Sequence, residues 1–218
     1  MALNQPYQHQ PSAIASYSYT DLAEGTGIVK YFAYQEEDNL GLGYKMGTSQ
    51  IYSGGGSELS GGSATNTFSK VKDVDFDLTT YNAPNTIRGT ATINACIASN
   101  ANGGYSSFTY VIFGIMKYSG TTETLLLSGQ SPIVAGGNAS TTNEIVNVQI
   151  PLNKTHFKKG DILRLNAEIW NYVDAGGAGF WSLGVDPMNR DGTYIIPSTD
   201  SPTSTTKLEV FIPYDLDL

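Results

Sequence analysis

Apolar and polar residues alternate with a period of two along most of this chain. The clearest case is the segment 86–97, where isoleucine, alanine and glycine occupy one face and threonine, arginine and asparagine the other. Successive side chains of a β-strand point to opposite faces, so this pattern predicts strands that are packed on one side. Segments 73–78, 163–173 and 207–214 show the same alternation. Residues 108–118 are apolar on both faces, which indicates a central strand or one covered by another chain.

Clusters of glycine separate these segments, and glycine accounts for 24 of the 218 residues. Glycine readily adopts the positive φ values that tight hairpin connections need. About ten to twelve short strands with such turns predict an all-β protein, an antiparallel β-sandwich. We favour a jelly roll over an immunoglobulin-like sandwich, because a single immunoglobulin domain needs only about 100 residues and the Cys–Trp–Cys pattern is absent.

The domain organisation follows from where the alternation is missing. Residues 1–12 contain Gln, Pro and His without alternation, so we predict an extended N-terminal arm here, followed by a single sandwich domain over residues 13–218. The glycine- and serine-rich stretch 53–66 is interpreted as a long loop inside that domain, because the strand patterns on its two sides are alike. The arm is either a frayed terminus or a segment that docks on a neighbouring subunit.

The other end of the chain also suggests contact with a neighbour. Residues 211–218 remain apolar almost to the last position, and Pro213 has no N–H to donate to a ladder, so its strand should lie at an edge or end there. The sequence therefore predicts a homo-oligomer, for which we expect a trimer. The candidate assembly contacts are Tyr7, Pro11, Phe211 and Tyr214.

Composition excludes some partners. The chain has 12 Lys and Arg against 20 Asp and Glu, a formal net charge of −8, and charged residues make up only 15%. Such a chain is poorly suited to neutralise phosphates, so we expect no nucleic-acid partner. Its N-terminus has neither a basic nor an apolar leader region, and the longest apolar run, 111–116, is far shorter than the roughly 18 residues of a membrane span. We therefore expect synthesis in a cytoplasm and no membrane contact.

The residues that carry nucleophilic chemistry are scarce. Cys96 is the only cysteine, and of the two histidines His9 lies in the arm and His156 precedes a basic turn. No Gly-x-Ser-x-Gly motif is present, and a dyad of Cys96 with His156 would need the fold to bring them together. We predict no catalytic residues, no cofactor and no enzymatic activity.

Two groups of acidic residues are candidate cation sites. Asp73, Asp75 and Asp77 share one face of a strand, where they could hold a cation or form a solvated face that protects a sheet edge. The loop 186–192 carries three oxygen side chains but lacks the spacing of an EF-hand. We favour the solvated face and an ordinary turn, and expect no metal.

Aromatic residues form the more credible candidate surface. Four lie within a dozen positions, around the glycine-rich loop 174–179, and exposed aromatic rings can stack on sugars or fill a partner's pocket. The alternative is that the two tryptophans belong to the core. The candidate ligand or partner residues are Trp170, Tyr172, Phe180 and Trp181.

Two stretches carry a resemblance to a known group of proteins. They are residues 13–27, which begin Ala-Ile-Ala-Ser-Tyr, and the end of the chain from Asp-Pro-Met-Asn-Arg-Asp-Gly-Thr at 186–193 to residues 206–214. They resemble uncharacterised virion structural proteins of marine tailed phages. The resemblance implies a capsid-associated subunit of the decoration, turret or fibre-base kind, which resides in the virion and binds neighbouring virion proteins. The alternative is a carbohydrate- or receptor-binding module of a virion or tail, with a host surface glycan as ligand.

Overall fold

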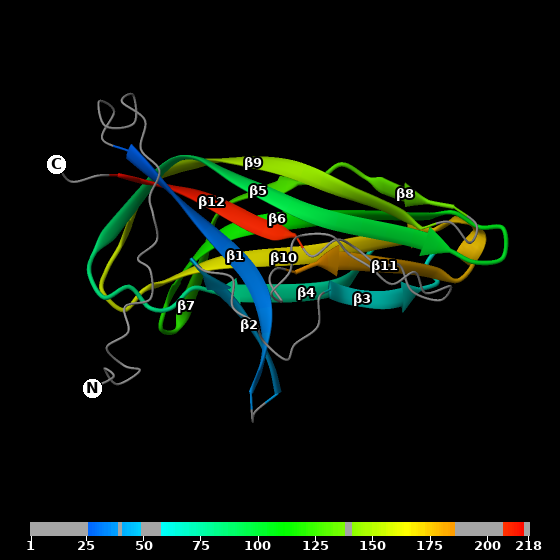
Figure 1. Cartoon of the computed structure of the whole chain (residues 1–218), viewed down its shortest axis with the longest axis horizontal. Coiled ribbons are helices and arrows are strands. Elements are labelled where there is room, and N and C mark those ends of the chain that lie inside the picture. Colours follow the sequence, from blue (N-terminus) through cyan, green and yellow to red (C-terminus); the bar gives the residue numbers. More distant parts are fainter. Residues whose placement is uncertain (1–25, 39–40, 49–57, 138–140, 186–206, 216–218) are drawn as a thin grey trace, which may run out of the picture.

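Twelve strands and one short 3-10 turn, η2 (Asp174–Gly176), make up the secondary structure of the described chain. The computed structural model describes residues 26–38, 41–48, 58–137, 141–185 and 207–215 (Figure 1). No helix among them is both long and apolar enough to cross a membrane. The strands are β1 (Thr26–Asp38), β2 (Gly41–Gly47), β3 (Glu58–Ser63), β4 (Ser69–Asp77), β5 (Asn85–Ala101), β6 (Ser107–Ser119), β7 (Thr122–Gln130), β8 (Val134–Gly136), β9 (Thr142–Phe157), β10 (Ile162–Val173), β11 (Gly179–Gly184) and β12 (Leu208–Asp215).

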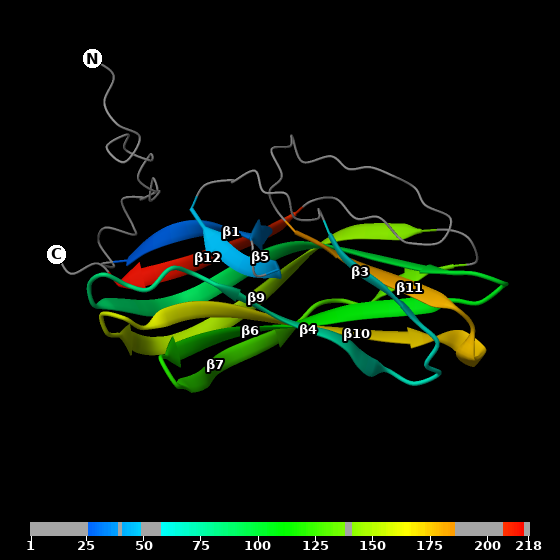
Figure 2. The same cartoon turned by 90° about the horizontal axis from the view of Figure 1, so that it is seen from below.

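The strands pack as two layers, which confirms the predicted antiparallel β-sandwich. The hydrogen-bonded order is β3-β11-β5-β12-β1-β2-β4-β10-β6-β7, with β9 on β5 and β8 on β6. Figure 2 shows β1, β12, β5 and β9 in one layer and β4, β10, β6 and β7 in the other. One parallel bridge, Lys45 with Asp77, connects the layers through β2 and β4, whereas the other strand pairs are antiparallel. The predicted arm, residues 1–12, lies outside the described residues.

Strand β5 organises the first layer. It pairs with β9 along nearly its whole length, from Asn85 opposite Phe157 to Ser99 opposite Thr142. Its other edge pairs first with β12 and then with β11. The pairing with β9 shifts at Gly89, whose φ of 118° is a conformation that other residues rarely adopt. β5 is thus hydrogen-bonded to three neighbouring strands.

The core lies between the layers and follows the alternation of the sequence. In β10 every second residue is buried, and the buried side chains include Leu163, Leu165 and Ile169. They belong to the same hydrophobic cluster as Ile93 of β5 and Phe113 of β6. Each buried side chain of this size contributes about 1.5–3 kcal/mol to folding. β6 is a central strand between β10 and β7, in agreement with its apolar pattern on both faces.

Candidate functional site

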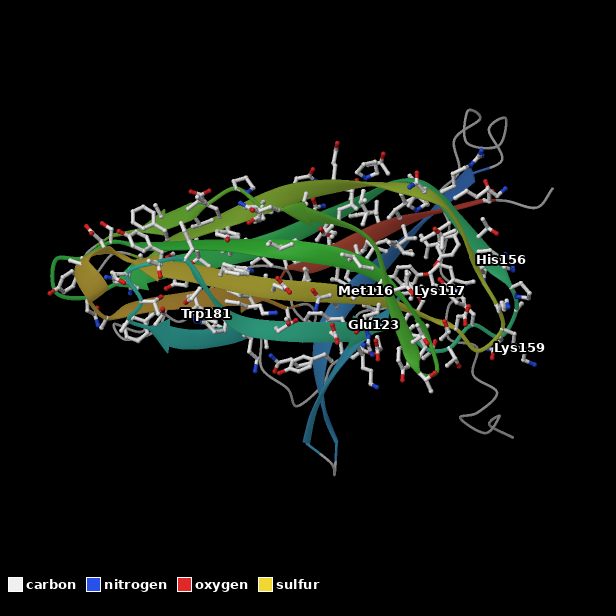
Figure 3. The ribbon with its side chains drawn as sticks, turned by 180° about the vertical axis from the view of Figure 1, so that it is seen from behind. Met116, Lys117, Glu123, His156, Lys159 and Trp181 are labelled. Atoms are coloured by element: carbon white, nitrogen blue, oxygen red, sulfur yellow. The ribbon has the colours of Figure 1, made fainter. Side chains whose placement is uncertain are left out.

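The solvent side of the second layer carries the most distinctive group of side chains. Because the even-numbered residues of β10 point away from the core, Arg164, Asn166, Glu168, Trp170 and Tyr172 stand on one face, each half-buried. The flanking strands complete this outer face. Their register places aspartates of β4 beside the first three and aromatic residues of β6 beside the last two. Figure 3 views this layer from behind, with Met116 of β6 and Glu123 of β7 labelled near its charged end.

Five aromatic rings occupy one end of this outer face, and we call them the aromatic cluster. Trp170 lies opposite Tyr110, with ring centroids 6.1 Å apart and planes within 4° of parallel. Tyr172 lies opposite Phe108 at 5.4 Å. Phe68 is 39% exposed and lies 5.0 Å from the ring of Tyr110 and 5.5 Å from that of Tyr172. The rings therefore form one continuous apolar surface toward solvent.

Arg164 is the centre of the charged end. It donates two hydrogen bonds to Asp77, from Nε at 2.6 Å and from Nη2 at 2.9 Å, a bidentate pair. Its Nη1 lies 3.1 Å from Asp75 and 2.6 Å from Glu123, and its guanidinium carbon lies 4.8 Å from the ring centre of Tyr118. The hydrogen bond to Asp77 is the main cause that raises the pKa of Arg164, although burial acts in the opposite direction. Each of the three guanidinium nitrogens therefore contacts at least one carboxylate.

Lys70 and Asn166 bind the remaining carboxylates. Lys70 Nζ lies 2.6 Å from Asp73 and 3.0 Å from Glu168, and Asn166 Nδ2 donates to Asp73 at 2.7 Å and to Asp75 at 2.8 Å. Burial acts to raise the pKa of Asp73, but the hydrogen bonds from Lys70 and Asn166 outweigh it, so this pKa lies below its ordinary value. The predicted row of aspartates thus forms an ion-pair network.

We call these side chains together the acidic network. Five carboxylates face two basic side chains, so three negative charges remain in excess. Trp170 Nε1 donates a hydrogen bond of 3.3 Å to Glu168, and this bond joins the acidic network to the aromatic cluster. Within the described ranges no group of three or more His, Cys, Asp or Glu side chains is arranged to hold a metal ion. The members of the acidic network are Lys70, Asp73, Asp75, Asp77, Glu123, Arg164 and Glu168.

Arg164→Met is expected to lower the free energy of unfolding by about 1–2 kcal/mol, because it leaves three carboxylates without their shared cation. The side chain of Arg164 is only 15% exposed, so solvent compensates for part of the loss. Urea denaturation measures the effect. The matched control is Arg88→Met, which removes a more exposed ion pair with Asp215 and should cost less than about 0.5 kcal/mol. Equal losses for both variants would contradict a special role for Arg164.

The four aromatic residues singled out from the sequence do not lie together. Trp170 and Tyr172 belong to the aromatic cluster. Phe180 and Trp181 lie on β11 in the other layer, between β3 and β5. Trp181 is 4% exposed and packs so closely on β3 that a Cβ atom at Gly61 would come within 2.8 Å of its ring. The sequence reasoning missed Phe68, Phe108 and Tyr110, which the strand register brings to Trp170 and Tyr172.

The four candidate assembly contacts differ in whether the structure describes them and in how far they are buried. Tyr7 and Pro11 lie outside the described residues. Phe211 is half-buried beside Lys30, whose Nζ lies 5.6 Å from its ring centre. Tyr214 is 9% exposed, and its hydroxyl lies 2.7 Å from those of both Tyr31 and Tyr81.

Burial raises the pKa values of all three of these tyrosines, Tyr31, Tyr81 and Tyr214. Tyr214 therefore serves the packing of its own chain as the middle member of a hydrogen-bonded row.

Cys96 and His156 are far apart. In the pairing of β5 with β9, His156 lies opposite Thr86 and Cys96 lies opposite Ile145. Positions 86 and 96 of an extended strand are separated by about 33 Å at 3.3 Å per residue. Cys96 is buried and donates a hydrogen bond to Asn143, whereas His156 is exposed near the end of β9 (Figure 3). The fold does not form a thiol–imidazole dyad from them, and His9 lies outside the described residues.

A pocket of about 420 Å³ lies where β2 meets β4. Tyr34, Lys45 and Met46 line it from the first layer, and Asp77, Leu78 and Ile162 from the second. The pocket adjoins the parallel bridge between Lys45 and Asp77, both of which line it. It borders the acidic network through Asp77.

Comparison with known proteins gives similarity at the level of solved structures. No protein-family model and no curated protein matches the chain. A CocE/NonD family hydrolase from Staphylococcus aureus is 12% identical with a TM-score of 0.45 and covers 87% of this chain. An aminopeptidase from the marine sediment archaeon Thaumarchaeota archaeon is 7% identical with a TM-score of 0.46 over 88% of this chain. This chain spans 37% of the length of each enzyme.

A structure of the infectious bursal disease virus Gx strain is 10% identical with a TM-score of 0.30, and the match covers 95% of this chain and 58% of that one. At this TM-score the match carries no role over to this chain. The resemblance to proteins of marine tailed phages stays a prediction.

The expectation that the chain is not an enzyme is corrected by the comparison, because a hydrolase and an aminopeptidase are among the similar structures. At these identities and TM-scores, no catalytic residue, substrate or partner is carried from those proteins to this chain.

Proposed function

We propose that this chain is a glycan-binding β-sandwich module and that the outer face of β4, β10 and β6 is its binding surface. The observation that carries the proposal is the aromatic cluster: five rings in mutual contact on the solvent side of a layer whose other side forms the core. Contiguous apolar side chains on a folded surface mark sites of interaction. Aromatic rings offer large, rigid contact areas, which suit the apolar faces of sugar rings.

The surroundings of the cluster supply the polar half of such a site. Sugar hydroxyls need hydrogen-bond acceptors and donors beside the ring on which the sugar stacks. Glu168 contacts Trp170 directly, and Asp73 and Asn166 follow along the same face. The side chains of Glu168 and Asp73 are 28% and 46% exposed, so both are accessible to a ligand. An apolar platform and a polar border therefore lie side by side.

The setting that we favour for this module is a virion or tail, where it would bind a glycan on the host surface. Support for that setting comes from the sequence resemblance to virion structural proteins of marine tailed phages. Self-association and contact with neighbouring virion proteins, as a decoration, turret or fibre-base subunit, belong to the same proposal.

Trp170→Ala tests the function. A glycan array identifies the oligosaccharide that the wild type binds best. Calorimetry with that sugar should show at least about a five-fold weaker affinity for the variant, because stacking on one aromatic side chain is worth roughly 1–3 kcal/mol. Trp170→Phe, which keeps an aromatic ring, should retain most of the affinity.

The matched control is Phe32→Ala, which removes a half-buried aromatic residue from β1 in the other layer and should leave affinity unchanged. Circular dichroism establishes that each variant is folded. A wild type that binds no glycan, or a Trp170→Ala variant that binds as the wild type does, would overturn the proposal.

A further inference from the structure

We infer that the outer face discriminates glycans by charge: it binds oligosaccharides with amino groups most tightly, neutral ones less tightly, and acidic ones least. This inference rests on the proposed function and specifies the chemical class of its ligand. It follows from the position of the acidic network beside the aromatic cluster.

The first step is the contact between the two groups of side chains. Glu168 precedes Trp170 by two positions on the same face of β10, and its carboxylate accepts a hydrogen bond from the indole N–H. Asp73 lies opposite Glu168 on β4. Two residues of a strand span about 7 Å, close to the size of one sugar ring. Substituents of a sugar stacked on Trp170 thus come within reach of both carboxylates.

The second step is that neither basic side chain of the acidic network is available to an anionic ligand. Arg164 is 15% exposed and is already bound to Asp75, Asp77 and Glu123. Lys70 is bound to Asp73 and Glu168. An acidic sugar would therefore be repelled by the carboxylates, because Arg164 and Lys70 are already ion-paired. An ammonium group could instead neutralise part of the excess of three negative charges.

The third step is the range of this effect. Charges on a solvated surface act over about 10 Å at 0.1 M salt and about 3 Å at 1 M salt. Glu168 and Asp73 lie beside Trp170, within the first range, whereas Asp77 at the end of β4 and Glu123 on β7 lie farther from it. The discrimination should therefore be strong at low salt and weak at high salt.

The experiment compares three β-1,4-linked hexasaccharides of equal length: fully deacetylated chitohexaose, its fully N-acetylated form, and the corresponding glucuronic acid hexamer. Calorimetry is done in 20 mM salt at a pH at which the amines are charged. We expect the deacetylated hexamer to bind at least ten-fold more tightly than the acidic one, with the neutral hexamer between them. In 0.5 M salt the ten-fold ratio should fall to about two-fold or less.

Glu168→Gln localises the effect, because glutamine keeps the shape and a hydrogen-bond acceptor for Trp170 but removes one charge. In this variant the ratio of the affinity for the amino hexamer to the affinity for the neutral one should fall at least three-fold. The ratio is the readout because Glu168 also borders the bound sugar, so both affinities can change together. The matched control is Glu144→Gln, an exposed glutamate on β9 in the other layer, which should change neither affinity.

The outcomes separate the two proposals. If the wild type binds neither the hexamers nor any glycan on an array, the proposed function fails and the inference fails with it. If binding occurs and depends on Trp170, but the acidic hexamer binds as well as the amino one, only the charge inference is overturned. The same holds if the order of affinities is as expected but Glu168→Gln leaves it unchanged, because the discrimination would then arise elsewhere.

Discussion

Asp161→Ala is expected to lower the free energy of unfolding by about 3 kcal/mol, an unusually large effect for a polar side chain. Asp161 is 6% exposed and closes the turn between β9 and β10. Its Oδ2 accepts the backbone N–H of Lys158 at 2.7 Å and lies 2.9 Å from Lys117 Nζ. The substitution leaves this N–H unpaired and removes the anion beside Lys117, whose side chain is only 20% exposed. Urea or thermal denaturation at pH 7 measures the loss.

The effect of Asp161 should depend on pH in a definite direction. The hydrogen bond from the Lys158 backbone, followed by that from Lys117, holds the pKa of Asp161 below its ordinary value. A carboxyl whose pKa is lower in the folded than in the unfolded protein contributes stability that is fully present above the unfolded pKa of about 3.9. That stability is lost as the pH falls through the folded pKa. The difference between wild type and Asp161→Ala should therefore be constant from pH 7 to about pH 5 and narrow below pH 4.

Two further variants separate the contribution of the Asp161 charge from that of its hydrogen bond and from a general effect of changing this turn. Asp161→Asn keeps an oxygen that can accept the Lys158 N–H but cannot pair with Lys117 as an anion, so it should cost about half as much as alanine. Lys159→Ala alters an exposed residue of the same turn and should cost less than about 0.5 kcal/mol. A loss at Asp161 that does not change between pH 7 and pH 3 would show that the ion pair contributes nothing.

The core could be predicted from the sequence because its signal is local. The alternation in β10 marked Leu163, Leu165 and Ile169 as residues of one face, and these are fully buried. The same alternation placed Asp73, Asp75 and Asp77 together on another strand, which the structure confirms. A period of two is a property of the strand itself, so it needs no knowledge of the neighbouring strand.

The candidate site could not be predicted in the same way, because it depends on the register between strands that are distant in the sequence. Tyr110 lies opposite Trp170, and Arg164 lies opposite Asp77, only through the pairing of β10 with β6 and β4. The short distance in the sequence instead suggested a group that included Trp181. The chain crosses to the other layer after β10, so Trp181 on β11 lies away from Trp170. A usable signal was present in β10 itself, because the alternating Arg164 and Asn166 can donate hydrogen bonds to the row of aspartates.

Gly136→Ala is expected to cost about 3 kcal/mol or more for a purely steric reason. A Cβ atom at this position would lie 2.0 Å from the carbonyl oxygen of Ser99 and 2.6 Å from the backbone nitrogen of Asn100. These are backbone atoms of β5, which is held by β9 on one edge and by β11 on the other. Because β5 is paired on both edges, its backbone cannot move easily. The added methyl group should therefore push β8 away from β5 and disturb the packing of that end of the sandwich. Thermal denaturation, with calorimetry for the enthalpy, measures the change.

Gly137→Ala is the matched control, one residue further along the chain. A Cβ atom at Gly137 would have no described atom within 4 Å, so this variant should remain within about 0.5 kcal/mol of the wild type. Both substitutions remove nearly the same conformational freedom from the unfolded chain, so the difference between them isolates the contact of β8 with β5 in the folded state. Equal stabilities for the two variants would contradict this close approach. A large difference would show that position 136 requires glycine because a side chain does not fit there. The backbone conformation of Gly136, unlike that of Gly89, is one that other residues adopt.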